Sequence, residues 1–198
     1  MAVPTAVLIL AGGAARRLGG GDKPLHEIGG RSLLARILDT LDPALPVAIS
    51  ANGDPARFAA FARPVLADGA FAGQGPLAGL LAGLDWAAGL GASALLSLPG
   101  DTPFLPRDLA AALAPAPAVA CSAGRTHHLV ALWPVAARAV LRARLMQPGR
   151  RDVAGFAAKI GMRKVDFPLR NGDPFLNVNT SDDLAAARTR AMREQDTG

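Results

Sequence analysis

Residues 6–23 read AVLILAGGAARRLGGGDK, in which an apolar part is followed by a part rich in glycine and charge. The first part, residues 6–10, is a continuous apolar run, which is typical of a strand buried on both faces of a sheet. The second part opens with a glycine pair and carries two arginines, an aspartate and a lysine. We therefore expect a buried strand that leads directly into a glycine-rich, cationic loop.

The rest of the chain alternates between short apolar runs and amphipathic patterns. The apolar runs predict further strands at 46–50, 64–67, 94–98, 119–121, 128–133 and 163–167. The amphipathic patterns predict helices that follow Ser32, that span 77–84, 106–113, 135–146 and 152–160, and that start near 181. This alternation predicts a mainly parallel sheet covered on both faces. We expect residues 1–198 to form one α/β domain whose ligands bind beyond the carboxyl ends of the strands.

The composition limits the classes of partner. The chain has 198 residues, of which 51% are hydrophobic and 19% are charged, so it can bury a packed core. Its net charge of +5 favours anionic partners, although arginines that only solubilise an alanine-rich surface would give the same value. Nucleic acid is the weaker option, because the chain has no tyrosine and no basic run interleaved with aromatic residues.

The cysteine content and hydropathy bear on the cellular compartment. Cys121 is the only cysteine, which excludes an internal disulfide and a cysteine zinc cluster and suits a reducing environment. No stretch approaches the roughly 20 apolar residues that cross a bilayer. No basic residue precedes the apolar start of the chain, as one would in a signal peptide. We expect a cytoplasmic protein that does not bind membranes.

The loop after the first strand has the composition of a triphosphate cradle. Its glycines let backbone amides approach phosphate oxygens, while Arg16, Arg17 and Lys23 add cationic donors. It is not a Walker loop, because Pro24 follows the lysine, and it is not a dinucleotide fingerprint, because Ala14 occupies the second glycine position. A flexible loop with solvated charges is the alternative. Phosphate binding is favoured, because most basic residues of this chain are arginine, and a lysine in this loop therefore departs from the general composition.

A carboxylate follows the strand predicted at 94–98. Asp101 lies just beyond that strand, where one carboxylate and the phosphates of a substrate together suit Mg²⁺. The alternative is an aspartate that merely caps a turn before Pro103. The phosphate-binding loop expected at the same edge of the sheet favours the metal ligand.

Two other strands end in polar residues at that edge. Asn52 and Asp68 are each a turn former when taken singly, but an amide can bind a base edge and a carboxylate can accept from ribose hydroxyls or guanine. Gly75 and Pro76 open the helix that follows, and the amino end of that helix can face the same ligand.

Four blocks of sequence carry a resemblance to a known family. The first, residues 10–23, has the pattern Leu-Ala-Gly-Gly-x-x-Arg-Arg-x-Gly-Gly-x-Asp-Lys. The later blocks are GPLAG at 75–79, DTP at 101–103 and NVNT at 177–180. In this order the blocks resemble the molybdenum cofactor guanylyltransferase family over nearly the whole chain. The resemblance implies a three-layer, Rossmann-like nucleotidyltransferase fold with a mostly parallel sheet.

The resemblance also implies a reaction. The terminal phosphate of molybdopterin attacks the α-phosphate of GTP, which yields the guanine dinucleotide cofactor and pyrophosphate. The N-terminal part of the chain would bind GTP, and the C-terminal part would bind the pterin cofactor. Lys23, Arg17 and Asp101 would be catalytic, with Asp101 as the Mg²⁺ ligand and the two cations neutralising phosphate charge. The implied GTP-binding residues are Leu10, Ala11, Gly12, Gly13, Lys23, Asn52, Asp68 and Asp101.

The pterin half of the site is implied by other blocks. The implied pterin-binding residues are Gly75, Pro76, His128, Asn177 and Asn179. Asn177 and Asn179 alternate in sequence, so both amides can point to one face of an extended segment. Asn179 and Thr180 can equally start the last helix, with Asp183 completing its cap, and both interpretations can hold together. Arg150 and Arg151 resemble a family arginine pair, and a solvated surface turn explains them equally well.

Two rival functions stay open at this point. A cytidylyltransferase acting on the same acceptor typically reads Leu-Ala-Ala-Gly where residues 10–13 read Leu-Ala-Gly-Gly, which favours GTP here. A non-catalytic carrier of GTP or cofactor is disfavoured by the retained Lys23 and Asp101. We expect a monomer whose substrates are GTP and molybdopterin, with room for transient contacts with molybdenum insertion proteins and apo-molybdoenzymes.

Overall fold

The computed structural model describes residues 4–12, 22–149 and 151–195, and a seven-stranded sheet in the order β5-β4-β1-β6-β8-β7-β9 forms its centre. The strands are β1 (Thr5–Leu10), β4 (Val47–Ser50), β5 (Val65–Leu66), β6 (Ala94–Pro99), β7 (Ala118–Ser122), β8 (Arg125–Pro134) and β9 (Arg163–Asp166). β5, β4, β1 and β6 are parallel, β8 is antiparallel to both of its neighbours, and β9 is parallel to β7. The predicted mostly parallel α/β fold is confirmed.

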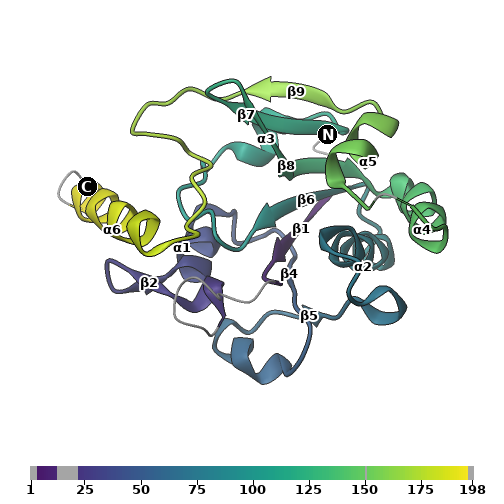
Figure 1. The fold of residues 1–198 in the computed structure, drawn as a ribbon, viewed down its shortest axis with the longest axis horizontal. Coiled ribbons are helices and arrows are strands. Elements are labelled where there is room, and N and C mark those ends of the chain that lie inside the picture. Colours follow the sequence, from purple (N-terminus) through teal and green to yellow (C-terminus); the bar gives the residue numbers. More distant parts are fainter. Residues whose placement is uncertain (1–3, 13–21, 150, 196–198) are drawn as a thin grey trace.

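Helices cover both faces of this sheet (Figure 1). They are α1 (Leu33–Thr40), α2 (Pro76–Gly89), α3 (Leu109–Leu113), α4 (Arg138–Met146), α5 (Val153–Lys159) and α6 (Ser181–Gln195). Residues of α1, α3 and the 3-10 helix η2 (Pro55–Phe61) share one core with the sheet, while residues of α2, α4 and α5 share the other. The result is the predicted three-layer arrangement.

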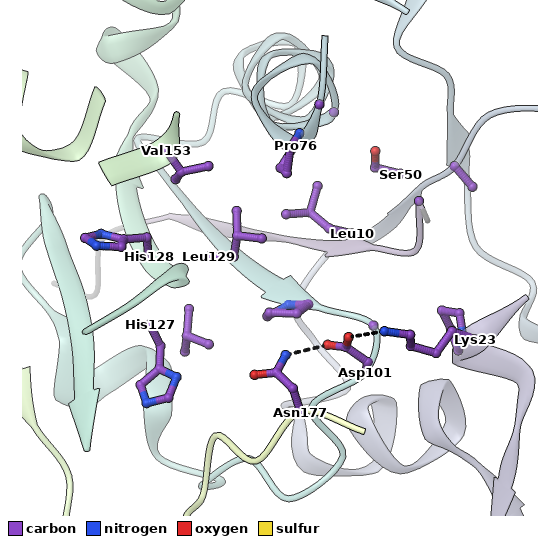
Figure 2. A pocket seen from close by; sticks show the side chains of 18 of the residues that line it. Leu10, Lys23, Ser50, Pro76, Asp101, His127, His128, Leu129, Val153 and Asn177 are labelled. Atoms are coloured by element: carbon purple, nitrogen blue, oxygen red, sulfur yellow. Dashed lines mark hydrogen bonds and ion pairs between the residues drawn. The ribbon is translucent and has the colours of Figure 1, made fainter. Parts of the chain in front are cut away.

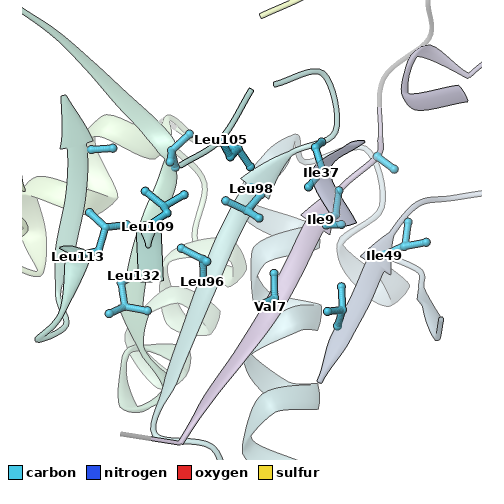
Figure 3. Packing of buried hydrophobic residues seen from close by; sticks show 14 of the residues in the cluster. Val7, Ile9, Ile37, Ile49, Leu96, Leu98, Leu105, Leu109, Leu113 and Leu132 are labelled. Atoms are coloured by element: carbon cyan, nitrogen blue, oxygen red, sulfur yellow. The ribbon is translucent and has the colours of Figure 1, made fainter. Parts of the chain in front are cut away.

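Strand β1 explains why both faces need a cover. Val7 and Ile9 belong to the first core (Figure 3), Ala6 and Leu8 belong to the second, and all four side chains are fully buried. Side chains alternate between the faces of a strand, so an uninterrupted apolar run requires an apolar layer on each side. The run at the start of the chain therefore determines that β1 is an interior strand.

Helix α2 packs unusually close to β1, which requires glycine at the contact. A Cβ atom at Gly83 would lie 2.5 Å from Cδ2 of Leu8, well inside van der Waals contact. A Cβ atom at Gly79 would likewise be too close to Oγ of Ser50 and Cδ2 of Leu10. This close approach brings the amino end of α2 to the carboxyl edge of the sheet.

Helix α6 lies outside the sheet and packs on a small hairpin, β2 (Glu27–Ile28) and β3 (Arg31–Ser32). Ala187 and Ala191 are buried there in a third cluster together with Ile28 and Val178. The N–H of Val178 donates to the backbone carbonyl of Asp101 at 2.9 Å. Helix α6 thus anchors the segment before it against the loop that follows β6.

Some local expectations were wrong in detail. The helix expected from residue 106 begins at Leu109, because Leu105 and Leu109 both enter the core and the chain between them forms a turn closed by a hydrogen bond to the Pro106 carbonyl. Residues 11–30 were expected to be loop, but their described part contains the short 3-10 helix η1 (Lys23–Leu25) and strand β2, which pairs with β3 just beyond them. No helix among the described residues is long and apolar enough to cross a membrane.

Candidate active site

A cleft of about 780 Å³ opens at the carboxyl edge of the sheet (Figure 2). It is lined by residues that follow β1, β4, β5 and β6, by the amino end of α2 and by the first half of β8. Because β8 runs against its neighbours, its beginning rather than its end lies at this edge. The cleft therefore has one wall made of strand-end loops and another made of β8.

The strands that form the floor end at the same level. Leu10 is paired with Ser50 of β4 on one side and with Pro99 of β6 on the other. Two backbone bonds extend this register into the loops, from the N–H of Ala11 to the Ser50 carbonyl and from the N–H of Gly100 to the Leu10 carbonyl, both at 2.9 Å. The loops that follow β4, β1 and β6 therefore leave the sheet next to one another.

Lys23 and Asp101 meet on this edge. Nζ of Lys23 donates to Oδ2 of Asp101 at 3.0 Å and to Oδ1 of Asn179 at 2.7 Å. The other carboxylate oxygen of Asp101 accepts from Nδ2 of Asn177 at 2.7 Å. The side chains of Lys23 and Asp101 are only 20% and 17% exposed, so this ion pair is screened less than a surface pair. Figure 2 shows Lys23, Asp101 and Asn177 together in one corner of the cleft, and Asn179 contacts Lys23 from outside the lining.

The cap of α6 holds Asn179 in place. Oδ2 of Asp183 accepts from the N–H groups of Asn179 and Thr180, both at 2.9 Å, and the N–H of Asp183 donates to Oγ1 of Thr180. This is the capping box expected from the sequence. The Asn179 N–H bond is the main cause that lowers the pKa of Asp183. The cap interpretation is confirmed, and it leaves the Asn179 side chain free to contact Lys23.

A second polar corner lies next to β4 and β5. Nδ2 of Asn52 donates to Oδ2 of Asp68 at 2.6 Å, and the N–H of Asp68 donates back to Oδ1 of Asn52 at 3.0 Å. Arg57 of η2 holds the same corner, because it donates to the Asn52 carbonyl at 2.6 Å and pairs with Asp22 at 3.0 Å. Asp22 directly precedes Lys23, so Arg57 connects this corner to the cationic one.

The amino end of α2 faces the cleft between the two walls. Gly75 precedes the helix with a φ of 75°, and Pro76 occupies its first turn, where its missing N–H costs nothing. Both residues line the cleft. The positive end of the helix dipole makes this a favourable place for an anion.

Strand β8 supplies the wall opposite the lysine. Arg125, His127 and His128 all line the cleft. Nδ1 of His128 is buried without a hydrogen-bond partner among the described residues, while Nε2 of His127 lies 2.7 Å from Oγ of Ser122. Burial is the main cause that lowers the pKa of His127; the neighbouring Asp173 acts in the opposite direction. This wall therefore combines the permanent cation of Arg125 with the imidazole ring of His127, whose neutral form is favoured by burial.

Most residues named from the sequence come together in this cleft. Those that line it are Leu10, Gly12, Lys23, Asn52, Asp68, Gly75, Pro76, Asp101, His128 and Asn177. Asn179 contacts Lys23 from outside the lining. Ala11 lies beneath the cleft, 3% exposed and with its N–H already donated to Ser50. Gly13, Arg16, Arg17 and Arg150 lie outside the described residues. Arg151 bonds backbone carbonyls at the end of α4 and does not line the cleft.

Sequence reasoning missed several residues of the cleft. Arg125 was not predicted, because ligands were sought after strands and the beginning of an antiparallel strand is not such a place. His127 falls in a predicted strand with no serine–acid pair expected beside it, and this expectation was wrong, because Ser122 and Asp173 lie next to its ring. Ser50 at the end of β4 was taken only as a strand residue. Arg57 was missed because η2 was not expected at all.

Comparison with known proteins agrees with this arrangement. Residues 7–161 match the MobA-like NTP transferase domain family. The molybdenum cofactor guanylyltransferase of Acidiphilium cryptum is 60% identical over 181 residues, which cover 91% of this chain and 92% of that protein. The protein of the same name from Rhodopseudomonas palustris strain HaA2 is 50% identical and covers 99% of this chain and 97% of its own length. The chain belongs to the molybdenum cofactor guanylyltransferase family.

A solved structure supports the fold of this family member. Molybdopterin-guanine dinucleotide biosynthesis protein A from Archaeoglobus fulgidus superimposes with a TM-score of 0.73 and covers 95% of this chain and 99% of its own. Its sequence is 21% identical, so it bears on the fold alone. The closer sequence relatives are the ones that bear on the chemistry.

The residues of this guanylyltransferase also define what metal site it can offer. No group of three or more His, Cys, Asp or Glu side chains in the described ranges could hold a metal. Asp101 is a single carboxylate, which fits Mg²⁺ held jointly by a protein and by substrate phosphates. Both of its oxygens already accept hydrogen bonds, from Lys23 and Asn177. Each oxygen has a second lone pair, so a cation can bind Asp101 beside these donors as well as in place of one of them.

Proposed function

We propose that this chain transfers GMP from GTP to the terminal phosphate of molybdopterin. An oxygen of the acceptor phosphate forms a bond to the α-phosphorus of GTP, the bond from that phosphorus to the oxygen bridging to the β-phosphate breaks, and pyrophosphate leaves. The observation that carries the proposal is the contact of Lys23 with Asp101 at the mouth of a cleft, in a chain 60% identical to a molybdenum cofactor guanylyltransferase.

The two walls of the cleft would bind different substrates. The N-terminal part of the chain, with Leu10, Gly12, Asn52 and Asp68, would bind the nucleoside, and the C-terminal part, with His128, Asn177 and Asn179, would bind the pterin acceptor. The amide and carboxylate of the Asn52–Asp68 pair suit the donor and acceptor edge of guanine. One domain then holds both substrates, because the corner formed by Lys23 and Asp101 lies between the walls.

The ion pair at this corner is the proposed catalytic element. Phosphoryl-type transfer needs positioning and charge stabilisation rather than a protein nucleophile. Lys23 would leave Asp101 to follow the charge that develops on the departing pyrophosphate. Asn177 would keep the carboxylate oriented during this exchange, since it bonds the oxygen that Lys23 does not use. Arg17, in the first loop, would add a second cation.

Mg²⁺ is the proposed metal, with Asp101 as its protein ligand. When bound, such an ion neutralises negative charge on the phosphates of the nucleotide. GTP and molybdopterin are the proposed substrates, and the amino end of α2 at Gly75 and Pro76 would face an acceptor phosphate. Contacts with molybdenum insertion proteins and apo-molybdoenzymes, a monomeric state and a cytoplasmic location stay predictions from the sequence.

Pyrophosphate release from GTP in the presence of molybdopterin and Mg²⁺ tests the function. We expect turnover with GTP, none with CTP and none without molybdopterin. Turnover with CTP instead would establish the cytidylyltransferase rival. Tight binding of GTP with no release of pyrophosphate would establish a carrier and refute the enzyme.

A further inference from the structure

His127 stands in the acceptor wall in a manner that the proposed reaction does not explain. Its side chain borders the cleft although the residue is only 8% exposed. Its ring contacts Phe175 with centroids 4.9 Å apart, and Phe175 in turn meets Phe167 edge to face at 5.1 Å. A ring packed in this way has little freedom to turn, so its nitrogen atoms keep fixed directions.

The neighbours of His127 determine which nitrogen carries a proton. Oγ of Ser122 lies 2.7 Å from Nε2 of His127 and donates to Oδ1 of Asp173 at 2.8 Å. A hydroxyl has one proton and a carboxylate only accepts, so the proton of Ser122 is committed to Asp173. Ser122 must then accept from the histidine, and Nε2 of His127 is the donor. The second nitrogen, Nδ1, has no hydrogen bond with any described residue and keeps its lone pair, provided that the ring is neutral.

The surroundings favour the neutral ring. Burial, the largest cause, lowers the pKa of His127, and Arg125 and His128 on the same strand lower it further. Asp173, which approaches from the connection between β9 and α6, acts in the opposite direction. The same carboxylate oxygen of Asp173 accepts two hydrogen bonds, one from Oγ of Ser122 and one from the N–H of Phe175 at 2.9 Å. The net direction is down, so the ring is neutral at neutral pH and Nδ1 can only accept.

We propose that His127 binds the pterin acceptor as a fixed hydrogen-bond acceptor, with Ser122 and Asp173 as positioning residues that set its Nε2–H tautomer. The inference rests on the proposed function and names the chemistry of its acceptor wall. The amino group and ring N–H groups of a pterin are donors that Nδ1 can accept, whereas an ionised phosphate offers only acceptors. His127 would therefore bind the pterin ring at the β8 wall, and the phosphate of the same molecule would lie nearer to Lys23.

The tautomer can be read directly by NMR of the imidazole nitrogens in the intact chain. The sequence has three histidines, His26, His127 and His128, so single variants assign the signals. We expect the Nε2–H form of His127 at neutral pH, and a mixture of tautomers in Ser122→Ala. Ser97→Ala is the matched control, because Ser97 is also buried, donates to a carbonyl and accepts from Trp133, but does not touch His127. An Nδ1–H form in the unaltered protein would overturn the proposal.

Ligand binding supplies the second readout on the unaltered protein. Adding molybdopterin should shift the Nδ1 signal of His127, because a lone pair that accepts a proton changes its nitrogen shift. Adding GTP alone should leave that signal in place. A Nδ1 signal that is unmoved by molybdopterin, or moved equally by GTP, would contradict the assignment.

Kinetics separate this inference from the proposed function. His127→Phe retains an aromatic ring beside Phe175 but has no acceptor, so KM for molybdopterin should rise about tenfold, the weight of one hydrogen bond, with KM for GTP unchanged. His127→Asn, which returns an oxygen close to the position of Nδ1, should recover part of the loss. If the unaltered chain transfers GMP and His127→Phe has the same KM for molybdopterin, only the inference fails. If the unaltered chain transfers no GMP, the proposed function itself fails.

Discussion

Replacing Asp101 with asparagine is the most direct perturbation of the site. The exchange retains the size of the side chain and removes its charge. One oxygen can still accept from Lys23, but the new amide then faces Nδ2 of Asn177, so two donors meet unless the Asn177 amide turns over. The variant thus keeps the shape of the corner while removing the ion pair and the proposed Mg²⁺ ligand.

The expected magnitudes follow from the burial of the pair. With exposures of 20% and 17%, the Lys23–Asp101 pair lies between an exposed pair, which contributes at most about 1 kcal/mol, and a buried one, whose disruption costs about 3–5 kcal/mol. A loss of about 2 kcal/mol lowers the Tm of a chain of this size by about 4–8 °C. Loss of about 4 kcal/mol of charge stabilisation in the transition state slows transfer by about 10³-fold.

Two assays on one preparation test Asp101→Asn. Thermal unfolding gives the change in Tm, and pyrophosphate release with GTP, molybdopterin and Mg²⁺ gives kcat. Asp85→Asn is the matched control, since Asp85 pairs with Arg138 and Arg142 at 38% exposure, away from the cleft, and should change kcat by less than about twofold. A kcat within tenfold of the unaltered enzyme would remove Asp101 from the metal site and refute this reasoning.

Three further outcomes are expected elsewhere in the molecule. Arg57→Ala unties the corner that Arg57 shares with Asp22, so KM for GTP should rise about tenfold with kcat nearly unchanged; an equal fall in kcat would assign it to the chemical step. Gly83→Val forces atoms against Leu8 and should lower the free energy of urea unfolding by about 2 kcal/mol; unchanged stability would mean that α2 can move away. The pKa of His127 in the folded chain lies below its usual value of about 6.5. As the pH drops below about 6.5, the unfolded chain therefore binds a proton before the folded chain does, and the free energy of unfolding should fall. Urea midpoints on either side of that pH measure the fall, which should shrink in His127→Phe.

The elements that carry the nucleotide side could be predicted from local sequence. The run 6–10 is apolar at every position, and only an interior strand accommodates that pattern. The polar residues that follow β1, β4 and β6 then had to share an edge, because parallel neighbours end together. The topology accounts for Asp101 at this edge, whereas the position of Lys23, 13 residues beyond the end of β1, also depends on the path of the loop.

The acceptor side could not be predicted in the same way. The polar turn around Gly124 predicts that β7 and β8 form a hairpin, and they do, but it does not say at which edge of the sheet β8 begins, because that depends on the pairing of β8 with β6. The Ser122–Asp173 bond joins residues separated by 51 positions, and Ser122 lies in a strand where every residue is buried, so its hydroxyl gave no signal. The 3-10 helix that presents Arg57 is only seven residues long, which is too short to show a clear helical pattern in the sequence.

The corner around Lys23 and Asp101 is formed by segments that lie far apart in the sequence and are therefore synthesised at different times. Lys23 reaches Asp101 across 78 positions and Asn179 across 156, and Asn177 reaches Asp101 across 76. Such distant partners meet only after the intervening loops have closed, which makes their pairing a late event in folding. A nascent chain whose last segment has not docked holds most of the sheet without a completed corner. If this corner catalyses the transfer as proposed, a chain whose last segment has not docked lacks Asn177 and Asn179 there and should not yet consume GTP.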